Sequence, residues 1–190
     1  RGLGDVYKRQ TSQGNVRRNS LMDFVNVQSN GKIAMKLDEG DKLINVRICH
    51  EDNDIMLAAR SGKCIRFPVT DVRVFVGRNS TGVRGIKLAE GDEVISMSIL
   101  LHSDATSEER DEYARIASAI KRISAERGDD SCVSPEDTGL LNVLTTEKYK
   151  EMAEREQFIL SVTSTGYGKR TSSYEYRVTC LLYTSPSPRD

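Results

Sequence analysis

Residues 77–88 of this chain read Gly77-Arg78-Asn79-Ser80-Thr81-Gly82-Val83-Arg84-Gly85-Ile86-Lys87-Leu88. The three glycines allow tight turns and close approach of another molecule. The stretch has three cations and no acid, and arginines beside Ser, Thr and Asn donors suit phosphate oxygens. It predicts a basic loop that leads into a strand and meets a nucleic-acid backbone. On these residues alone, an ordinary solvated turn between two strands is the alternative.

This stretch belongs to an internal repeat. A short motif with a glycine turn followed by cations occurs at residues 12–18, 60–66 and 164–170. A second motif, which contains Glu-Gly-Asp, occurs at residues 36–44 and 87–95. The first two copies are 48 residues apart for the first motif and 51 for the second. A period near 50 with strand-like units predicts a propeller-like array.

Each repeat is predicted to supply four short strands. In the complete copy these are about residues 54–59, 64–68, 83–88 and 94–100, which are rich in Val, Ile and Leu. Ser61-Gly62 predicts a tight hairpin, and Pro68 predicts a strand end or an edge. The predicted fold is mainly β: a partial β-pinwheel of four-stranded blades over residues 11–101, with the next blade resuming at 158–179.

An acidic insertion interrupts the period. The third glycine turn follows the second after 104 residues, and residues 102–157 hold 8 Lys and Arg against 14 Asp and Glu. Thr106 and Glu109 form a capping box before a helical pattern that can stop at Gly128. A second helix is predicted from Thr146 to about Gln157. The insertion is expected to lie in a hairpin between strands near residues 99 and 158.

The two ends have a different character. Codons for residues 1–10 can be written so that their reverse complement, read in another frame, encodes Leu-Leu-Tyr-Thr-Ser-Pro-Ser-Pro, which is found at residues 181–188. We interpret residues 1–10 and 180–190 as translated sequencing-library adapter, and they are excluded from the fold prediction. Residues 11–179 then form a fragment of a longer protein.

Catalysis and metal binding find little support. The two histidines, His50 and His102, are far apart, and no Walker loop, His-Glu-x-x-His or Gly-x-Ser-x-Gly motif occurs. The cysteines show no Cys-x-x-Cys pair, which argues against zinc and disulfides and fits a reducing cytoplasm. Tyr167 and Tyr174 are interpreted as structural residues. The acids of the Glu-Gly-Asp motifs are interpreted as turn residues.

The cations, by contrast, recur at equivalent positions after the glycine turns. Equivalent positions in successive blades should share one rim, where repeated cations would form a curved positive stripe that binds and bends a polyanion. Solvated hairpin ends are the alternative. The candidate DNA-binding residues are Arg17, Arg18, Lys32, Lys36, Lys63, Arg66, Arg78, Arg84, Lys87, Lys169 and Arg170.

Several of these motifs resemble the C-terminal domain of the DNA gyrase A subunit. The matching stretches are Asn79–Leu88 followed by Glu90-Gly91-Asp92, and Gly31–Leu37, Gly62–Phe67 and Gly166–Thr171. The resemblance covers nearly all of residues 11–179 except the insertion. It implies a β-pinwheel that wraps duplex DNA on its outer rim.

The resemblance also implies an ATP-dependent type II topoisomerase that negatively supercoils DNA in the bacterial cytoplasm at the nucleoid. Its partners would be duplex DNA, a gyrase B subunit, and a second copy of the A subunit in an A2B2 assembly. ATP and Mg²⁺ would act through the B subunit, with no cofactor in this fragment. The catalytic tyrosine region and the basic glycine-rich box of gyrase are not among these residues. The A-type subunit of topoisomerase IV and a protein-interaction propeller therefore stay open as alternatives, and the acidic insertion is expected to project away from DNA.

Overall fold

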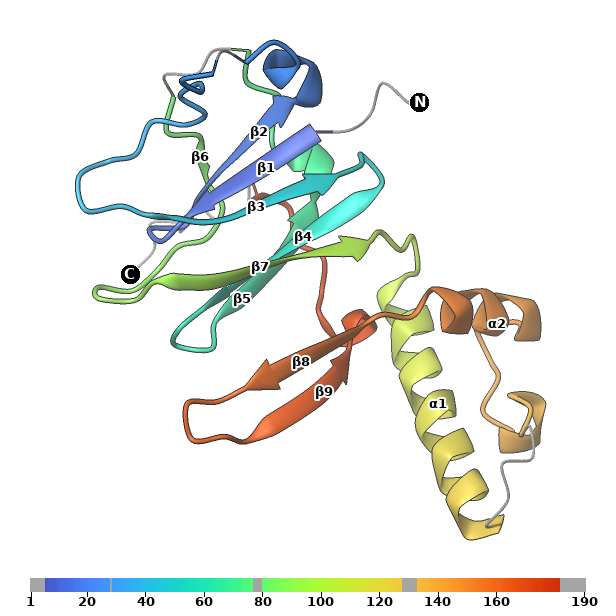
Figure 1. Ribbon diagram of the computed structural model, residues 1–190. Coiled ribbons are helices and arrows are strands. Elements are labelled where there is room, and N and C mark those ends of the chain that lie inside the picture. Colours follow the sequence, from blue (N-terminus) through green and yellow to red (C-terminus); the bar gives the residue numbers. More distant parts are fainter. Residues whose placement is uncertain (1–5, 28, 77–79, 128–132, 182–190) are drawn as a thin grey trace, which may run out of the picture. The chain divides into compact units, whose positions relative to one another are not determined.

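A hairpin closed by a glycine turn occurs three times in the computed structural model, which describes residues 6–27, 29–76, 80–127 and 133–181 (Figure 1). Gly14, Gly62 and Gly166 have φ angles of 85°, 85° and 88°, a region that glycine adopts without steric cost. The N–H of each glycine donates to the carbonyl three residues earlier at 3.0 Å. The hairpins are β1 (Val6–Thr11) with β2 (Asn15–Ser20), β4 (Asn53–Ala59) with β5 (Cys64–Pro68), and β8 (Phe158–Val162) with β9 (Gly168–Ser172). The repeated hairpin predicted from the glycine motif is therefore confirmed.

The chain divides into two compact units. Unit 1 contains Arg1–His102 and Val178–Asp190, and unit 2 contains Ser103–Arg177. A short 3-10 turn follows the second strand of every hairpin. These turns are η1 (Leu21–Phe24), η2 (Val69–Asp71) and η4 (Ser173–Glu175).

Unit 1 contains two antiparallel sheets. One has the order β3-β1-β2-β6 and the other the order β5-β4-β7. The additional strands are β3 (Leu43–Cys49), β6 (Val83–Arg84) and β7 (Val94–Leu101). A single core of buried apolar side chains draws on both sheets; Val16, Ile55, Leu57 and Phe67 are fully buried in it. The burial of these side chains stabilises the unit through the hydrophobic effect.

The strand predicted at residues 83–88 does not join the strands that flank it in sequence. It is reduced to β6, which pairs with β2 of the other sheet through Val83 opposite Val16. On the side of β5 that does not face β4, Arg66 instead forms an isolated parallel bridge with Val178. The prediction of one blade from four consecutive strands is therefore wrong in its pairing. The reason is that strands from different repeats complete each other's hydrogen-bonding edges.

Gly82 explains how this exchange fits. Its φ is +94°, and a Cβ there would lie 2.3 Å from the Val16 carbonyl oxygen. Only a residue without a side chain allows the chain to approach β2 so closely. The glycine of the opening motif therefore permits contact between two strands.

Residues that the sequence analysis excluded take part in the sheet. Val6–Gln10 lie in β1, which pairs with both β2 and β3. A strand is expected at this place, because β4 precedes Gly62 as β1 precedes Gly14. Gln10 is fully buried, and neither its amide nitrogen nor its amide oxygen has a hydrogen-bond partner among the described residues. Leu181, which was also excluded, packs against the core of unit 1.

Unit 2 contains the helices of the insertion and the third hairpin. The helices are α1 (Ser107–Arg127) and α2 (Thr146–Arg155), with the short turn η3 (Glu136–Thr138) between them. The predicted capping box is confirmed: Thr106 N donates to Glu109 Oε2 at 2.6 Å and Glu109 N donates to Thr106 Oγ1 at 3.2 Å. Neither helix, as described, combines the length and apolar character of a membrane span. Strand β7, which precedes the insertion, pairs with β4, and β8, which follows it, pairs with β9.

Three tyrosines hold the helices against the third hairpin. Tyr113 stacks on Tyr149 with ring centroids 4.8 Å apart and meets Tyr174 edge-on at 5.2 Å. The Tyr174 hydroxyl donates to the Met152 carbonyl at 2.8 Å, and the Tyr113 hydroxyl donates to Glu156 Oε2 at 3.0 Å. Burial, together with Glu156, raises the pKa of Tyr113 well above its ordinary value. Tyr174 is thus a packing residue, as its structural interpretation required.

Candidate nucleic-acid interface

The hairpin turns of unit 1 are held by the aspartates of the Glu-Gly-Asp motifs. Asp41 accepts from the Ser12 hydroxyl at 2.8 Å and from Gln13 N at 3.0 Å. Asp92 repeats the contact with Ser61, accepting from its hydroxyl at 2.7 Å and from its N–H at 3.1 Å. The turn interpretation of these acids is therefore confirmed. Each aspartate also ties the start of the strand that follows it to the hairpin before it.

Hydrogen bonds lower the pKa of both aspartates. At Asp41, burial raises the pKa, but hydrogen bonds from Thr11, Ser12, Gln13 and Lys42 outweigh it, so that the pKa is lowered. At Asp92, the Ser61 hydroxyl is the largest cause of a lowered pKa. Both carboxylates are therefore ionised at neutral pH and act as fixed acceptors. The turns that these two aspartates hold lie at one edge of unit 1. We call it the turn edge, and it consists of residues 11–15, 40–43, 60–63 and 84–94.

Three of the candidate cations are exposed at the turn edge. They are Lys63 in the β4–β5 turn, Arg84 in β6 and Lys87 after it. Lys63 Nζ donates to the Lys87 carbonyl at 3.2 Å, and Arg84 pairs with Asn15 at the end of β2. Three cations of one repeat, from the β4–β5 turn and from the segment that contains β6, are thereby brought to one edge.

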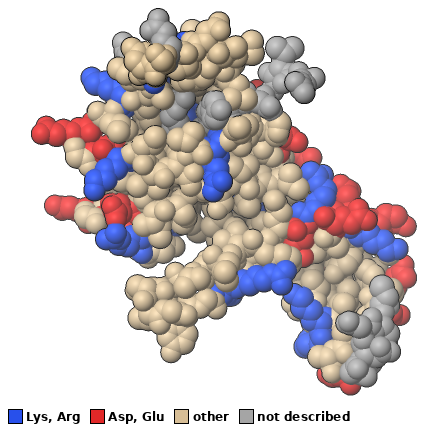
Figure 2. Space-filling view, in the orientation of Figure 1, with Lys and Arg blue, Asp and Glu red and all other residues tan. Residues whose placement is uncertain are grey.

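The turn edge also carries acids. Arg60 forms an ion pair with Glu93, and Asp92 is bound to Ser61. On the face drawn in Figure 2, basic and acidic side chains alternate along the side where the hairpin turns lie. The cations therefore form separate positive points on that face of unit 1, whereas a continuous positive stripe was expected.

Two further candidates lie in the loop that precedes β3. Lys36 is exposed, and Lys32 is half-buried with its Nζ donating to the Asp23 carbonyl at 3.2 Å. Arg78 lies outside the described residues. Among the residues that the structure describes, no group of His, Cys, Asp or Glu is placed to hold a metal ion.

Arg17 and Arg18 are buried in β2. Arg17 Nε donates to Asn19 Oδ1 at 2.9 Å, its guanidinium lies 5.2 Å from the centre of the Phe75 ring, and burial lowers its pKa. Arg18 forms an ion pair with Glu51. Arg17 and Arg18 are 0% and 4% exposed, so neither side chain can reach a phosphate on the surface.

Arg66 is buried in the same way in β5. Its Nε lies 2.8 Å from Asp54 Oδ2, its terminal nitrogen donates to the Leu101 carbonyl at 3.0 Å, and it is 2% exposed. His102 Nδ1 lies 2.7 Å from the other oxygen of Asp54. The prediction that Arg17, Arg18 and Arg66 contact phosphate is contradicted by their burial. No local signal separates them from exposed cations, because the exposed Arg170 follows Gly166 by four residues just as Arg66 follows Gly62.

The third hairpin keeps its cations exposed. Lys169 and Arg170 are both exposed in β9 of unit 2. The Arg170 guanidinium lies over the Phe158 ring, 3.6 Å from its centre. Sequence reasoning missed this stack, because Phe158 and Arg170 are brought to one face of the hairpin only through the β8–β9 register.

Comparison with known proteins agrees with this architecture. The family described as "DNA gyrase C-terminal domain, beta-propeller" matches residues 10–50, 53–100 and 157–179. The A subunit of DNA gyrase from Granulibacter bethesdensis is 53% identical over 180 residues, which cover 88% of this chain and 19% of the relative. The corresponding gyrase A subunit of Rickettsia bellii is 52% identical over 169 residues, which cover 89% of this chain and 18% of the relative.

The coverage also locates the insertion. The family match omits residues 101–156. The two relatives align with 88% and 89% of this chain, so their alignments must include at least part of that segment.

Solved structures of the C-terminal domains of DNA topoisomerase IV and of DNA gyrase A align over 54% and 52% of this chain, with TM-scores of 0.49 and 0.47 and identities of 23% and 26%. These alignments cover 32% of each solved chain. The chain spans about a fifth of the length of the curated relatives it matches.

Proposed function

Because this chain belongs to the family of DNA gyrase C-terminal domains with a beta-propeller fold, we propose that it binds duplex DNA through the exposed cations of the turn edge. Lys63, Arg84 and Lys87 are the residues proposed to contact phosphates. Such contacts supply affinity without reading sequence. Neutralisation of phosphates along the edge would favour bending of the DNA toward it.

The observation that carries this proposal is the clustering of three exposed cations at one edge, from the β4–β5 turn and from the segment that contains β6. Lys63 and Lys87 are joined by a hydrogen bond, and Asp92 holds the β4–β5 turn in place beside them. A preformed edge loses little conformational entropy on binding, so its cations bind more tightly than those of a mobile loop.

In the complete protein, this part would serve a type II topoisomerase of the gyrase class. We expect it to wrap a DNA segment that other regions cleave and pass, with negative supercoiling as the result. A gyrase B subunit would supply the ATP and Mg²⁺ chemistry, and a second copy of the A subunit would complete an A2B2 assembly in the bacterial cytoplasm. This chain's own contribution is DNA binding.

The test is the affinity for linear duplex DNA as a function of salt. Each phosphate neutralised by a cation contributes a slope of about −0.9 in log affinity against log salt, so three contacts predict about −2.7. Lys63→Gln, Arg84→Gln and Lys87→Gln should each reduce this slope by about 0.9 on every DNA sequence. Lys150→Gln, at an exposed lysine of α2, is the matched control. A slope near zero, or a loss confined to one sequence, would refute the proposal.

A further inference from the structure

The arginine that is buried in the first two hairpins is exposed in the third, where it has a different partner. Arg18, Arg66 and Arg170 occupy the same position, four residues after the glycine of each hairpin. Arg18 pairs with Glu51 and Arg66 pairs with Asp54, so each of these charges is balanced within unit 1. In the third copy Phe158 stands in the place of Asp54, and the guanidinium stacks on its ring. Arg170 is thus the exposed copy, and its charge is not balanced by the acid of the repeat.

The stack holds Arg170 in a form that suits an external anion. A ring 3.6 Å from the guanidinium carbon fixes the plane of the group but leaves the N–H donors at its edge free to point outward. This planar fork matches two phosphate oxygens, and stacked arginines retain that capacity. Phe158 is 41% exposed, so the stack lies at the surface of unit 2.

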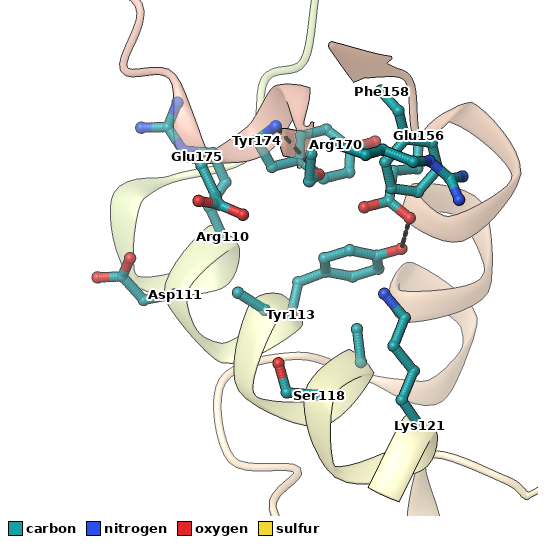
Figure 3. A pocket seen from close by; sticks show the side chains of 13 residues that line it. Arg110, Asp111, Tyr113, Ser118, Lys121, Glu156, Phe158, Arg170, Tyr174 and Glu175 are labelled. Carbon is teal, nitrogen blue, oxygen red and sulfur yellow. Dashed lines mark hydrogen bonds between the residues drawn. The ribbon is translucent and has the colours of Figure 1, made fainter. Parts of the chain in front are cut away.

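A second cation lies in the same hollow. The hollow is lined by residues of α1, of the β8–β9 hairpin and of η4, which include Lys121 and Arg170. In Figure 3, Lys121 and Arg170 lie on one side of the hollow, whereas Arg110, Asp111 and Glu175 lie on the other. Figure 2 shows Lys and Arg side chains gathered where the β8–β9 hairpin faces α1.

The acids of the hollow leave this side positive. Asp111 and Glu175 accompany Arg110 on the opposite side (Figure 3). Glu156 lies nearer and accepts the Tyr113 hydroxyl proton in a hydrogen bond of 3.0 Å. One acid therefore faces two cations on the Lys121 side, and it is already engaged by a tyrosine.

We propose that Lys121 and Arg170 together bind a phosphate of duplex DNA in this hollow, with Phe158 positioning the arginine. The inference rests on the proposed function and extends it to the helical insertion. Although residues 102–157 are acidic as a whole, α1 would add a cation to the DNA-binding surface. The expectation that the insertion projects away from DNA would then be wrong.

The experiment compares DNA affinity among variants of the full chain, measured by fluorescence anisotropy with linear duplex DNA. Lys121→Gln and Arg170→Gln should each weaken binding by up to about eightfold at 0.1 M salt, the factor that corresponds to one lost phosphate contact. The double variant should lose less than the product of the two, because both side chains serve one phosphate. Arg122→Gln is the matched control, because Arg122 is the next residue of α1, is exposed and does not line the hollow.

Two further variants separate a specific site from general charge. Arg170→Lys should not restore affinity, because a lysine lacks the stacked fork. Phe158→Leu should weaken binding while leaving the net charge unchanged. If Arg122→Gln weakens binding as much as Lys121→Gln, the inference is overturned. If the turn-edge variants weaken binding but Lys121→Gln and Arg170→Gln do not, the inference fails and the proposed function stands. If none of these variants weakens binding, both fail.

Discussion

Removal of Asp54 should destabilise unit 1 strongly, because it would leave the Arg66 charge buried without its counter-ion. The side chains of Asp54 and Arg66 are 0% and 1% exposed, and their nearest atoms are 2.8 Å apart. Breaking a buried pair by deleting one partner costs roughly 3–5 kcal/mol, which is a large part of the stability of an ordinary domain. Asp54→Leu alone is therefore expected to unfold the unit or to bring it close to unfolding.

Replacement of both partners should be far milder. In Asp54→Leu with Arg66→Met, no charge is left behind and the site is filled by apolar side chains of similar size. Such replacements are often neutral or stabilising. The His102 side chain is 34% exposed, so its ring can reach water when Asp54 is removed. The double variant is expected to lie within about 1 kcal/mol of the parent chain.

The assay is urea denaturation followed by far-UV circular dichroism, since the chain contains no tryptophan. The folded double variant is then tested for DNA binding, where its affinity and salt slope should equal those of the parent chain. That result would establish Arg66 as a residue of the core. The reasoning would be refuted by an Asp54→Leu variant that loses less than about 1 kcal/mol, or by a stable double variant whose salt slope falls by about one contact.

Three other changes test particular packing features. Gln10→Val should raise the free energy of unfolding by about 1–3 kcal/mol, because it removes a buried amide without partners, and a denaturation midpoint no higher than the parent's would contradict this. Gly82→Ala should destabilise the chain more than Gly91→Ala, because a Cβ would meet the Val16 carbonyl at residue 82 and open space at residue 91; equal losses in thermal melts would argue against the close approach. Burial raises the pKa of Glu112, but hydrogen bonds from the N–H groups of Asn142, Val143 and Leu144 outweigh it, so that the pKa is lowered. The stability that the parent chain gains over Glu112→Gln should therefore be complete above the ordinary pKa of 4.5 and shrink as the pH falls below it. A difference in melting temperature that does not change with pH would refute this.

The repeated elements were accessible from sequence because their signals are local. Gly62 with its flanking residues predicts a tight turn, and Thr106 with Glu109 predicts a helix start, since each pattern satisfies backbone groups within a few residues. Both predictions are confirmed by the hydrogen bonds observed. The residues whose burial was missed are Arg17, Arg18 and Arg66. Their contacts with Phe75, Glu51 and Asp54, respectively, join residues that are distant in sequence or lie in another strand. A cation after a glycine turn is therefore predicted to be exposed until the strand register is known.

The sequence by itself determined the mainly β character of this protein, the period of its hairpins and the site of its helical insertion. These features depend on turn glycines, strand-forming residues and capping pairs that act over short distances. Only the tertiary structure decided which cations remain at the surface. Lys63 and Lys87 reach the turn edge together because β6 crosses to β2, whereas Arg66 is drawn into the core by Asp54. A charge is buried only where the fold supplies its counter-ion, and that pairing is a property of the assembled strands.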